Sequence, residues 1–189
     1  MSCQKIIHVI SCIDFRYDEL VCNYFTQIGL DACYYNSTTA GAGLPLGYYN
    51  SCKQLCCAKG CKPCNCDIQT LKKSLDLNLQ ISSSLSDIKI VYVLNHQDCG
   101  AFKAFIGCSG YPDTLGKDNE KEIKINENVL TNAKKYLLKN NKGISVRLGL
   151  IDTNGSTADY DPCTKKWTLQ YKGSGTDPKG LWYNYPFDN

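Results

Sequence analysis

The sequence predicts an α/β fold, in which helices flank a mostly parallel β-sheet that ends in a late antiparallel edge strand. Short apolar runs alternate with longer stretches whose apolar residues recur every three or four positions, and this alternation is typical of a parallel sheet. The run at 88–94 is almost entirely apolar, as expected of a strand that helices cover on both faces. Near the C-terminus a turn-rich segment separates two strand-like runs, which predicts that the last strand returns antiparallel at the edge.

The local pattern assigns each element in turn. Strands are expected over 5–10, 32–36, 88–94, 144–151 and 167–172. Helices are expected over 17–27, 68–84, a short stretch ending near 106, and about 120–140. With 189 residues the chain suits a single domain over 1–189, with a cysteine-rich segment at about 49–66 and an irregular tail from 173.

Charge and hydropathy exclude several classes of protein. The net charge is only +3 and the lysines are scattered, so we expect neither a nucleic-acid nor a membrane partner. No stretch approaches the roughly 20 apolar residues of a membrane span. The first residues run directly into a strand-like segment without a signal-peptide cleavage site, which favours a cytoplasmic protein.

Two short polar segments follow predicted strands and together offer a metal site. The first contains Cys12, and the second contains His96 and Cys99. Because ligands bind beyond the carboxyl ends of parallel strands, the topology can bring both segments to one edge of the sheet. Two thiolates and an imidazole are the protein ligands of a catalytic zinc, which keeps a fourth position for water. The sequence therefore predicts Zn²⁺ at Cys12, His96 and Cys99.

A carboxylate and a guanidinium follow the first thiol at alternate positions. In an extended segment, Cys12, Asp14 and Arg16 point to one side. Asp14 as a fourth ligand would close the metal site, whereas Arg16 holding Asp14 aside would leave room for water. The alternatives are a structural zinc closed by Asp14, or buried thiols with a core histidine and no metal. The other histidine, His8, is expected to be a sheet residue.

These motifs carry a resemblance to a known family. Cys12-x-Asp14-x-Arg16 with His96-x-x-Cys99-Gly100 resembles the β-class carbonic anhydrases. The resemblance implies a β-carbonic anhydrase-like fold and reversible hydration of CO2 to bicarbonate by attack of zinc-bound hydroxide. It also implies that Asp14 and Arg16 are catalytic and set whether carboxylate or water takes the fourth position.

Further similarities extend the match. Thr39-Ala40-Gly41 takes the place of the family's Asn-Ala-Gly turn, which implies that the backbone of Ala40 and Gly41 lines the substrate pocket. The family also implies a homodimer or a higher homo-oligomer. Departures at Thr38, Thr39 and Asn95 leave two alternatives open. One is a zinc hydrolase of another small heterocumulene such as CS2, and the other is a catalytically silent structural or interaction module.

Relative to the family, the cysteine-rich segment at about 49–66 looks like an insertion, and it and the tail fall outside these motifs. Six cysteines lie close together in the insertion: Cys52, Cys56, Cys57, Cys61, Cys64 and Cys66. A second metal site, disulfides and free thiols all remain open for them, because six cysteines allow 15 pairings. The tail carries four aromatic residues: Trp182, Tyr183, Tyr185 and Phe187. We expect a homodimer in which this apolar tail or the first helix crosses to the partner.

Overall fold

The structure is a computed structural model that describes residues 6–30, 33–47, 65–106, 118–175 and 178–187. All but one of the insertion's cysteines lie outside these ranges, so the expectations for them remain predictions. Cys66 falls in the first turn of a helix, but its side chain is not among those described. Among the described cysteines, Cys12, Cys22, Cys99 and Cys163 are free and Cys33 is disulfide-bonded.

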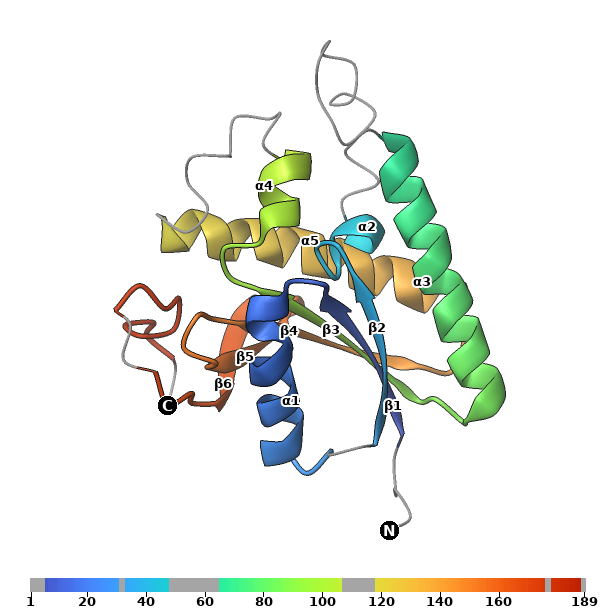
Figure 1. Ribbon diagram of the computed structural model, residues 1–189, viewed down its shortest axis with the longest axis horizontal. Coiled ribbons are helices and arrows are strands. Elements are labelled where there is room, and N and C mark those ends of the chain that lie inside the picture. Colours follow the sequence, from blue (N-terminus) through green and yellow to red (C-terminus); the bar gives the residue numbers. More distant parts are fainter. Residues whose placement is uncertain (1–5, 31–32, 48–64, 107–117, 176–177, 188–189) are drawn as a thin grey trace.

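A six-stranded sheet in the order β2-β1-β3-β4-β5-β6 forms the centre of the molecule (Figure 1). Its strands are β1 (Ile7–Cys12), β2 (Tyr34–Thr39), β3 (Ile90–His96), β4 (Ser145–Ile151), β5 (Thr157–Asp161) and β6 (Lys166–Tyr171). β1 to β4 are parallel, whereas β5 and β6 are antiparallel to their neighbours. The mostly parallel α/β sheet is thus confirmed. Two strands are antiparallel, whereas the sequence predicted one. The additional strand is β5, which was not predicted because its segment has a mixed, turn-rich sequence typical of a loop.

The first three strands end later than the sequence predicted, and this shift matters for the site. The ends expected at 10, 36 and 94 lie at Cys12, Thr39 and His96. Cys12 and His96 are therefore the last residues of their strands. β1 and β3 pair in parallel from Ile7 opposite Ile90 to Ile10 opposite Val93, so both strands end at the same edge of the sheet.

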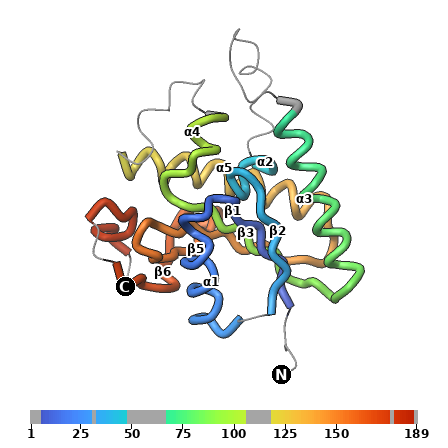
Figure 2. The backbone as a smooth tube through the Cα atoms, viewed as in Figure 1, coloured from blue at the N-terminus to red at the C-terminus, as the bar shows by residue number. Residues whose placement is uncertain are grey.

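Helices cover both faces of the sheet (Figures 1 and 2). They are α1 (Asp18–Gln27), α2 (Leu44–Gly47), α3 (Asn65–Leu85), α4 (Gly100–Ile106) and α5 (Asn119–Asn140), with a 3-10 turn, η1 (Phe15–Tyr17), before α1. On one face α1 packs Val21, Tyr24 and Phe25 against β1 and β3. On the other face α3 and α5 bury residues such as Leu75 and Leu130 in the main core. Among the described residues, no helix has both the length and the hydropathy that a membrane span requires.

The aromatic tail folds over the sheet of its own chain. Trp182 is buried, stacks against Trp167 with ring centroids 5.0 Å apart, and donates from Nε1 to the carbonyl oxygen of Leu150 at 3.0 Å. Tyr185 and Phe187 pack around the same indole ring. The chain therefore buries Trp182 by itself, whereas Tyr183 of the tail stays exposed. That the tail or the first helix crosses to a partner stays a prediction.

Candidate metal centre

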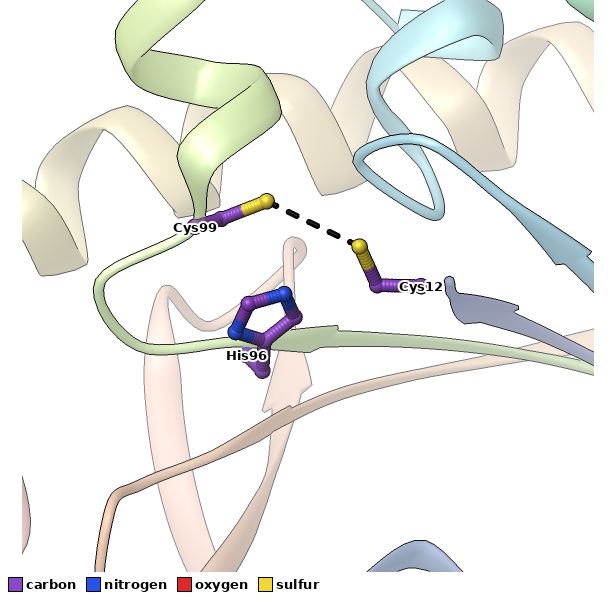
Figure 3. Close-up of side chains that lie close together, drawn as sticks. All are labelled: Cys12, His96 and Cys99. Carbon is purple, nitrogen blue, oxygen red and sulfur yellow. Dashed lines mark hydrogen bonds between the residues drawn. The ribbon is translucent and has the colours of Figure 1, made fainter. Parts of the chain in front are cut away.

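Three potential metal ligands meet at the carboxyl edge of the sheet. Cys12 ends β1, His96 ends β3, and Cys99 lies just before α4. All three side chains are buried, and their ligand atoms lie within 4.8 Å of one another (Figure 3). This cluster could hold a metal ion, as the two motifs predicted.

The turn between His96 and Cys99 positions the second thiol. Asp98 has a positive φ of 57°, a left-handed conformation that acidic and amide residues tolerate better than most. Its backbone N–H donates to the buried carboxylate of Glu122 on α5, and its carboxylate forms an ion pair with Lys103 on α4. These contacts fix a turn that aims Cys99 back toward β1.

The hydrogen bonds of His96 leave one ring nitrogen facing the thiols. Nδ1 lies 2.7 Å from the carbonyl oxygen of Gln97, which only a protonated Nδ1 can satisfy. The Tyr17 hydroxyl donates to the same carbonyl at 2.7 Å, and its ring stacks 4.1 Å from the imidazole. Nε2 is buried and has no hydrogen-bond partner. A buried nitrogen without a partner costs about 1–3 kcal/mol, and metal coordination removes that cost.

The sulfur–sulfur distance also fits a metal ion. A tetrahedral zinc with Zn–S bonds of about 2.3 Å holds two sulfurs about 3.8 Å apart. Cys12 Sγ and Cys99 Sγ are 3.8 Å apart. Thiolate and imidazole donors together are those that zinc prefers. The spacing and chemistry of the donor set therefore both suit zinc.

The charge state of the thiols is consistent with this fit. The Cys99 thiol, helped by His96 and by the Gly41 backbone N–H at 3.3 Å from Cys12 Sγ, lowers the pKa of Cys12. The neighbouring Cys12 sulfur and burial raise the pKa of Cys99. Without a cation, only one of two such close sulfurs ionises readily, because two buried thiolates repel each other. A divalent ion between them would stabilise both as thiolates.

Asp14 and Arg16 form a bidentate ion pair beside the cluster. Arg16 Nη2 lies 2.6 Å from Asp14 Oδ2, and Arg16 Nε lies 2.9 Å from Asp14 Oδ1. Hydrogen bonding to Arg16 is the main reason that the pKa of Asp14 is lowered. Asp14 Oδ2 is 3.9 Å from His96 Nε2, so the carboxylate borders the position where an ion would sit.

The backbone path to Arg16 differs from the extended path expected for Cys12, Asp14 and Arg16. Asp14 has extended dihedral angles and caps the 3-10 turn η1 by accepting from the backbone N–H of Arg16 at 3.2 Å. Arg16 therefore lies in the turn, and its side chain folds back onto the carboxylate. The capping preference of aspartate ends the extended segment at this residue.

Contacts that neither motif predicted also hold this arrangement. Arg16 also reaches across to the second motif, with Nη1 3.3 Å from Asp98 Oδ2 and Nη2 donating to the Asp98 carbonyl at 3.2 Å. The acidic residue between the two ligands of the second motif was a visible signal for this contact. Glu122 was also detectable, because it shares the core-facing stripe of α5 with Ile123 and Asn126.

A cavity of about 560 Å³ opens beside Cys12, Asp14 and Arg16. Its wall includes Ala40, and its remaining lining is apolar: Ile13, Phe15, Ala101, Ala104 and Phe105. The turn after β2 requires glycine, since Gly41 has φ of 80° and a Cβ there would lie 2.8 Å from Leu44 Cβ. The Ala40–Gly41 turn thus lies beside the cluster, with the Gly41 N–H on Cys12.

No protein-family model matches the sequence, and no curated protein matches it. Solved structures do match, and three of them are β-carbonic anhydrases. CcaA gives a TM-score of 0.54 at 15% identity over 90% of this chain and 80% of that chain. Isoform I from Trichomonas vaginalis gives 0.44 at 18% identity over 92% and 87%. Tetrameric enzymes from Sordaria macrospora give 0.44 at 12% identity over 92% and 84%.

The chain therefore has the fold of β-carbonic anhydrases, as its motifs indicated. At this edge of the sheet it carries a buried Cys-His-Cys cluster that could bind a metal ion.

Proposed function

We propose that the protein is a zinc-dependent β-class carbonic anhydrase that interconverts CO2 and bicarbonate. Cys12, His96 and Cys99 would hold the ion. The observation that carries this proposal is the unpartnered, buried Nε2 of His96 facing two sulfurs 3.8 Å apart. The fold supports it independently.

The ion would supply a Lewis acid that lowers the pKa of water to about 7. Asp14 would accept a hydrogen bond from the reacting oxygen and orient it, because its carboxylate borders the cluster. Arg16 would keep Asp14 from taking the fourth position, since it occupies both carboxylate oxygens. The apolar wall formed by Ile13, Phe15 and Ala104 would receive the apolar substrate.

The same cavity supports a second candidate, the hydrolysis of another heterocumulene such as CS2. Its volume of about 560 Å³ far exceeds that of one CO2 molecule. The third alternative, a catalytically silent module, has no need of the ion pair between Asp14 and Arg16.

A stopped-flow hydration assay on the zinc-loaded protein tests the proposal and separates these candidates. We expect CO2 hydration at pH 8.5, above the pKa of about 7 expected for bound water. Asp14→Ala should abolish most activity while zinc is retained. Arg16→Ala should inactivate by freeing Asp14 to bind the ion, and Arg16→Lys, which cannot form the bidentate pair, should do so in part.

The outcomes have distinct meanings. Activity toward CS2 alone would transfer the proposal to the second candidate. A fully zinc-loaded protein that hydrates neither substrate would overturn both and leave the silent module.

A further inference from the structure

The other histidine of the chain, His8, also has a buried ring nitrogen without a hydrogen-bond partner. His8 lies in β1 and is 1% exposed. Among the described residues, the buried side-chain nitrogens and oxygens without a hydrogen-bond partner are Nε2 of His96 and Nε2 of His8. Metal binding explains His96. It does not explain His8, because the one cluster of metal-ligating groups in the described part of the chain excludes it.

Neighbouring hydrogen bonds define the proton position on His8. Nδ1 lies 2.6 Å from Ser82 Oγ, and Ser82 Oγ donates its single proton to the Leu79 carbonyl at 3.0 Å. Ser82 must therefore accept from His8 Nδ1–H. Burial lowers the pKa of His8 to about 4, so the ring is neutral at pH 7 and carries only that proton. Nε2 is thus a bare hydrogen-bond acceptor.

A cavity of about 220 Å³ adjoins this histidine. It lies where α3 packs against β1 and β2, and Figure 2 shows the path of these three elements. The volume is several times the roughly 30 Å³ that one water occupies in the liquid. Ile81 and Leu85 give it an apolar wall, and Tyr35, Asn78 and Ser82 give it polar groups. None of the described residues that line it is charged, so nothing there favours an anion.

We propose that this cavity binds a small neutral molecule with a hydroxyl group on an apolar body. As the ligand enters, the His8 ring turns its buried Nε2 toward the cavity, the hydroxyl donates to that nitrogen, and the body packs against Ile81 and Leu85. The ligand satisfies a nitrogen that no described side chain reaches, and it covers apolar side chains of α3. The site is separate from the metal centre, since His8 precedes Cys12 by four residues, about 13 Å along the strand. The proposal does not depend on carbonic anhydrase activity.

Phenol and anisole are a matched pair of probes, because a methyl group replaces the donating proton of phenol in anisole. The full chain is labelled with [15N]histidine, and its two histidines give two sets of ring nitrogen signals that a His8→Phe variant assigns. We expect His8 to show a protonated Nδ1 and a bare Nε2. Phenol should shift the Nε2 signal in a saturable manner, whereas anisole should not. His96 serves as the internal reference and should not shift.

Several results would overturn the proposal. They are a protonated Nε2, equal shifts with both probes, and an Nε2 signal that already reports a hydrogen bond and does not respond to phenol. The last result would mean that the cavity holds only water.

Two exposed leucines of α3 provide a control that does not disturb His8. Leu85 lines the cavity and is 68% exposed, whereas Leu77 is 56% exposed on the same helix and does not line it. Leu85→Ala should weaken phenol binding by about three- to tenfold through lost apolar contact. Leu77→Ala should leave the affinity unchanged. Equal effects of the two substitutions would contradict the placement of the ligand.

Discussion

At the scale of single residues, one backbone carbonyl determines the chemistry of the centre. The Gln97 oxygen accepts from Nδ1 of His96, and this leaves Nε2 free toward the sulfurs. It also accepts from the Tyr17 hydroxyl, whose ring stacks on the imidazole. The tautomer and the orientation of the histidine are thus fixed before any ion binds, and hydrogen bonds of this kind commonly orient histidine ligands of metal ions.

Replacing Cys99 by serine tests the ligand set. A hydroxyl is a poor substitute for a soft thiolate, so Cys99→Ser should lower bound zinc by about one equivalent per chain. Elemental analysis measures this directly. Cys163→Ser is the matched control, because Cys163 is free and exposed. Unchanged zinc in the Cys99 variant would contradict the assignment.

His8 predicts a specific dependence of stability on pH. Burial lowers its pKa from 6.5 to about 4 in the folded protein. Between these values the unfolded chain binds a proton that the folded chain does not, so stability falls as the pH falls from 6.5 to 4. The loss should reach about 3 kcal/mol.

Urea unfolding of wild type and His8→Gln across this pH range isolates the effect. Protonation of the metal ligands at acid pH is common to both proteins and cancels in the comparison. The variant should lose less stability on acidification. Parallel profiles would show that His8 does not titrate as its burial predicts.

At the scale of elements, the turn from β3 to α4 is fixed by a residue far along the chain. The buried carboxylate of Glu122 on α5 accepts from the backbone N–H of Asp98. The same turn receives Arg16 from the first motif and Lys103 from α4. Three elements therefore converge on a residue with left-handed dihedral angles, and they hold Cys99 in place.

Glu122→Ala should leave that N–H without its partner at a cost of about 1–3 kcal/mol. For a chain of this size the melting temperature should fall by roughly 2–12 °C. Zinc affinity should fall as well, since the turn carries Cys99. Glu120→Ala is the control, because Glu120 is exposed in the same helical turn. Equal melting temperatures for both variants would exclude this role for Glu122.

The sequence was sufficient to predict the elements and the Cys-His-Cys cluster where the local pattern and the sheet topology agree. The apolar run of β3 and the helical spacing of α5 predicted those elements, and strand ends predicted the meeting of Cys12, His96 and Cys99. Other features depend on tertiary contacts that leave no local pattern. Thr157 to Asp161 form a strand only because β4 and β6 pair with them. The link between Asp98 and Arg16 joins positions 82 residues apart.

At the scale of the whole molecule, the described surface has an apolar region at the mouth of the cavity beside the Cys-His-Cys cluster. Ile13 is 60% exposed and Phe15 is 83% exposed, on either side of Asp14. The tail does not cover them, because it packs against β4 and β6. Exposed apolar groups that rim a site are typical of an interaction surface. We therefore propose that the chain forms a homodimer or higher homo-oligomer through this region.

Sedimentation tests the proposed assembly. At micromolar concentration the protein should sediment with at least twice the 21.1 kDa mass of one chain. Phe15→Ser should weaken the assembly. Tyr183→Ser, at a residue 53% exposed in the tail, should not. A wild-type protein that sediments as a single chain would rule the assembly out.

The side chain of Gln97 connects the turn after β3 to the C-terminal tail. Its Oε1 accepts from the backbone N–H groups of Thr153 and Leu181, and its Nε2 donates to the carbonyl of Lys179. The residue beside the candidate metal ligand His96 is therefore also the anchor of the tail. Ion binding at the cluster would therefore be linked to docking of the tail, because both involve the turn that carries Gln97. Metal removal should thus expose the tail to proteases before the rest of the sheet unfolds.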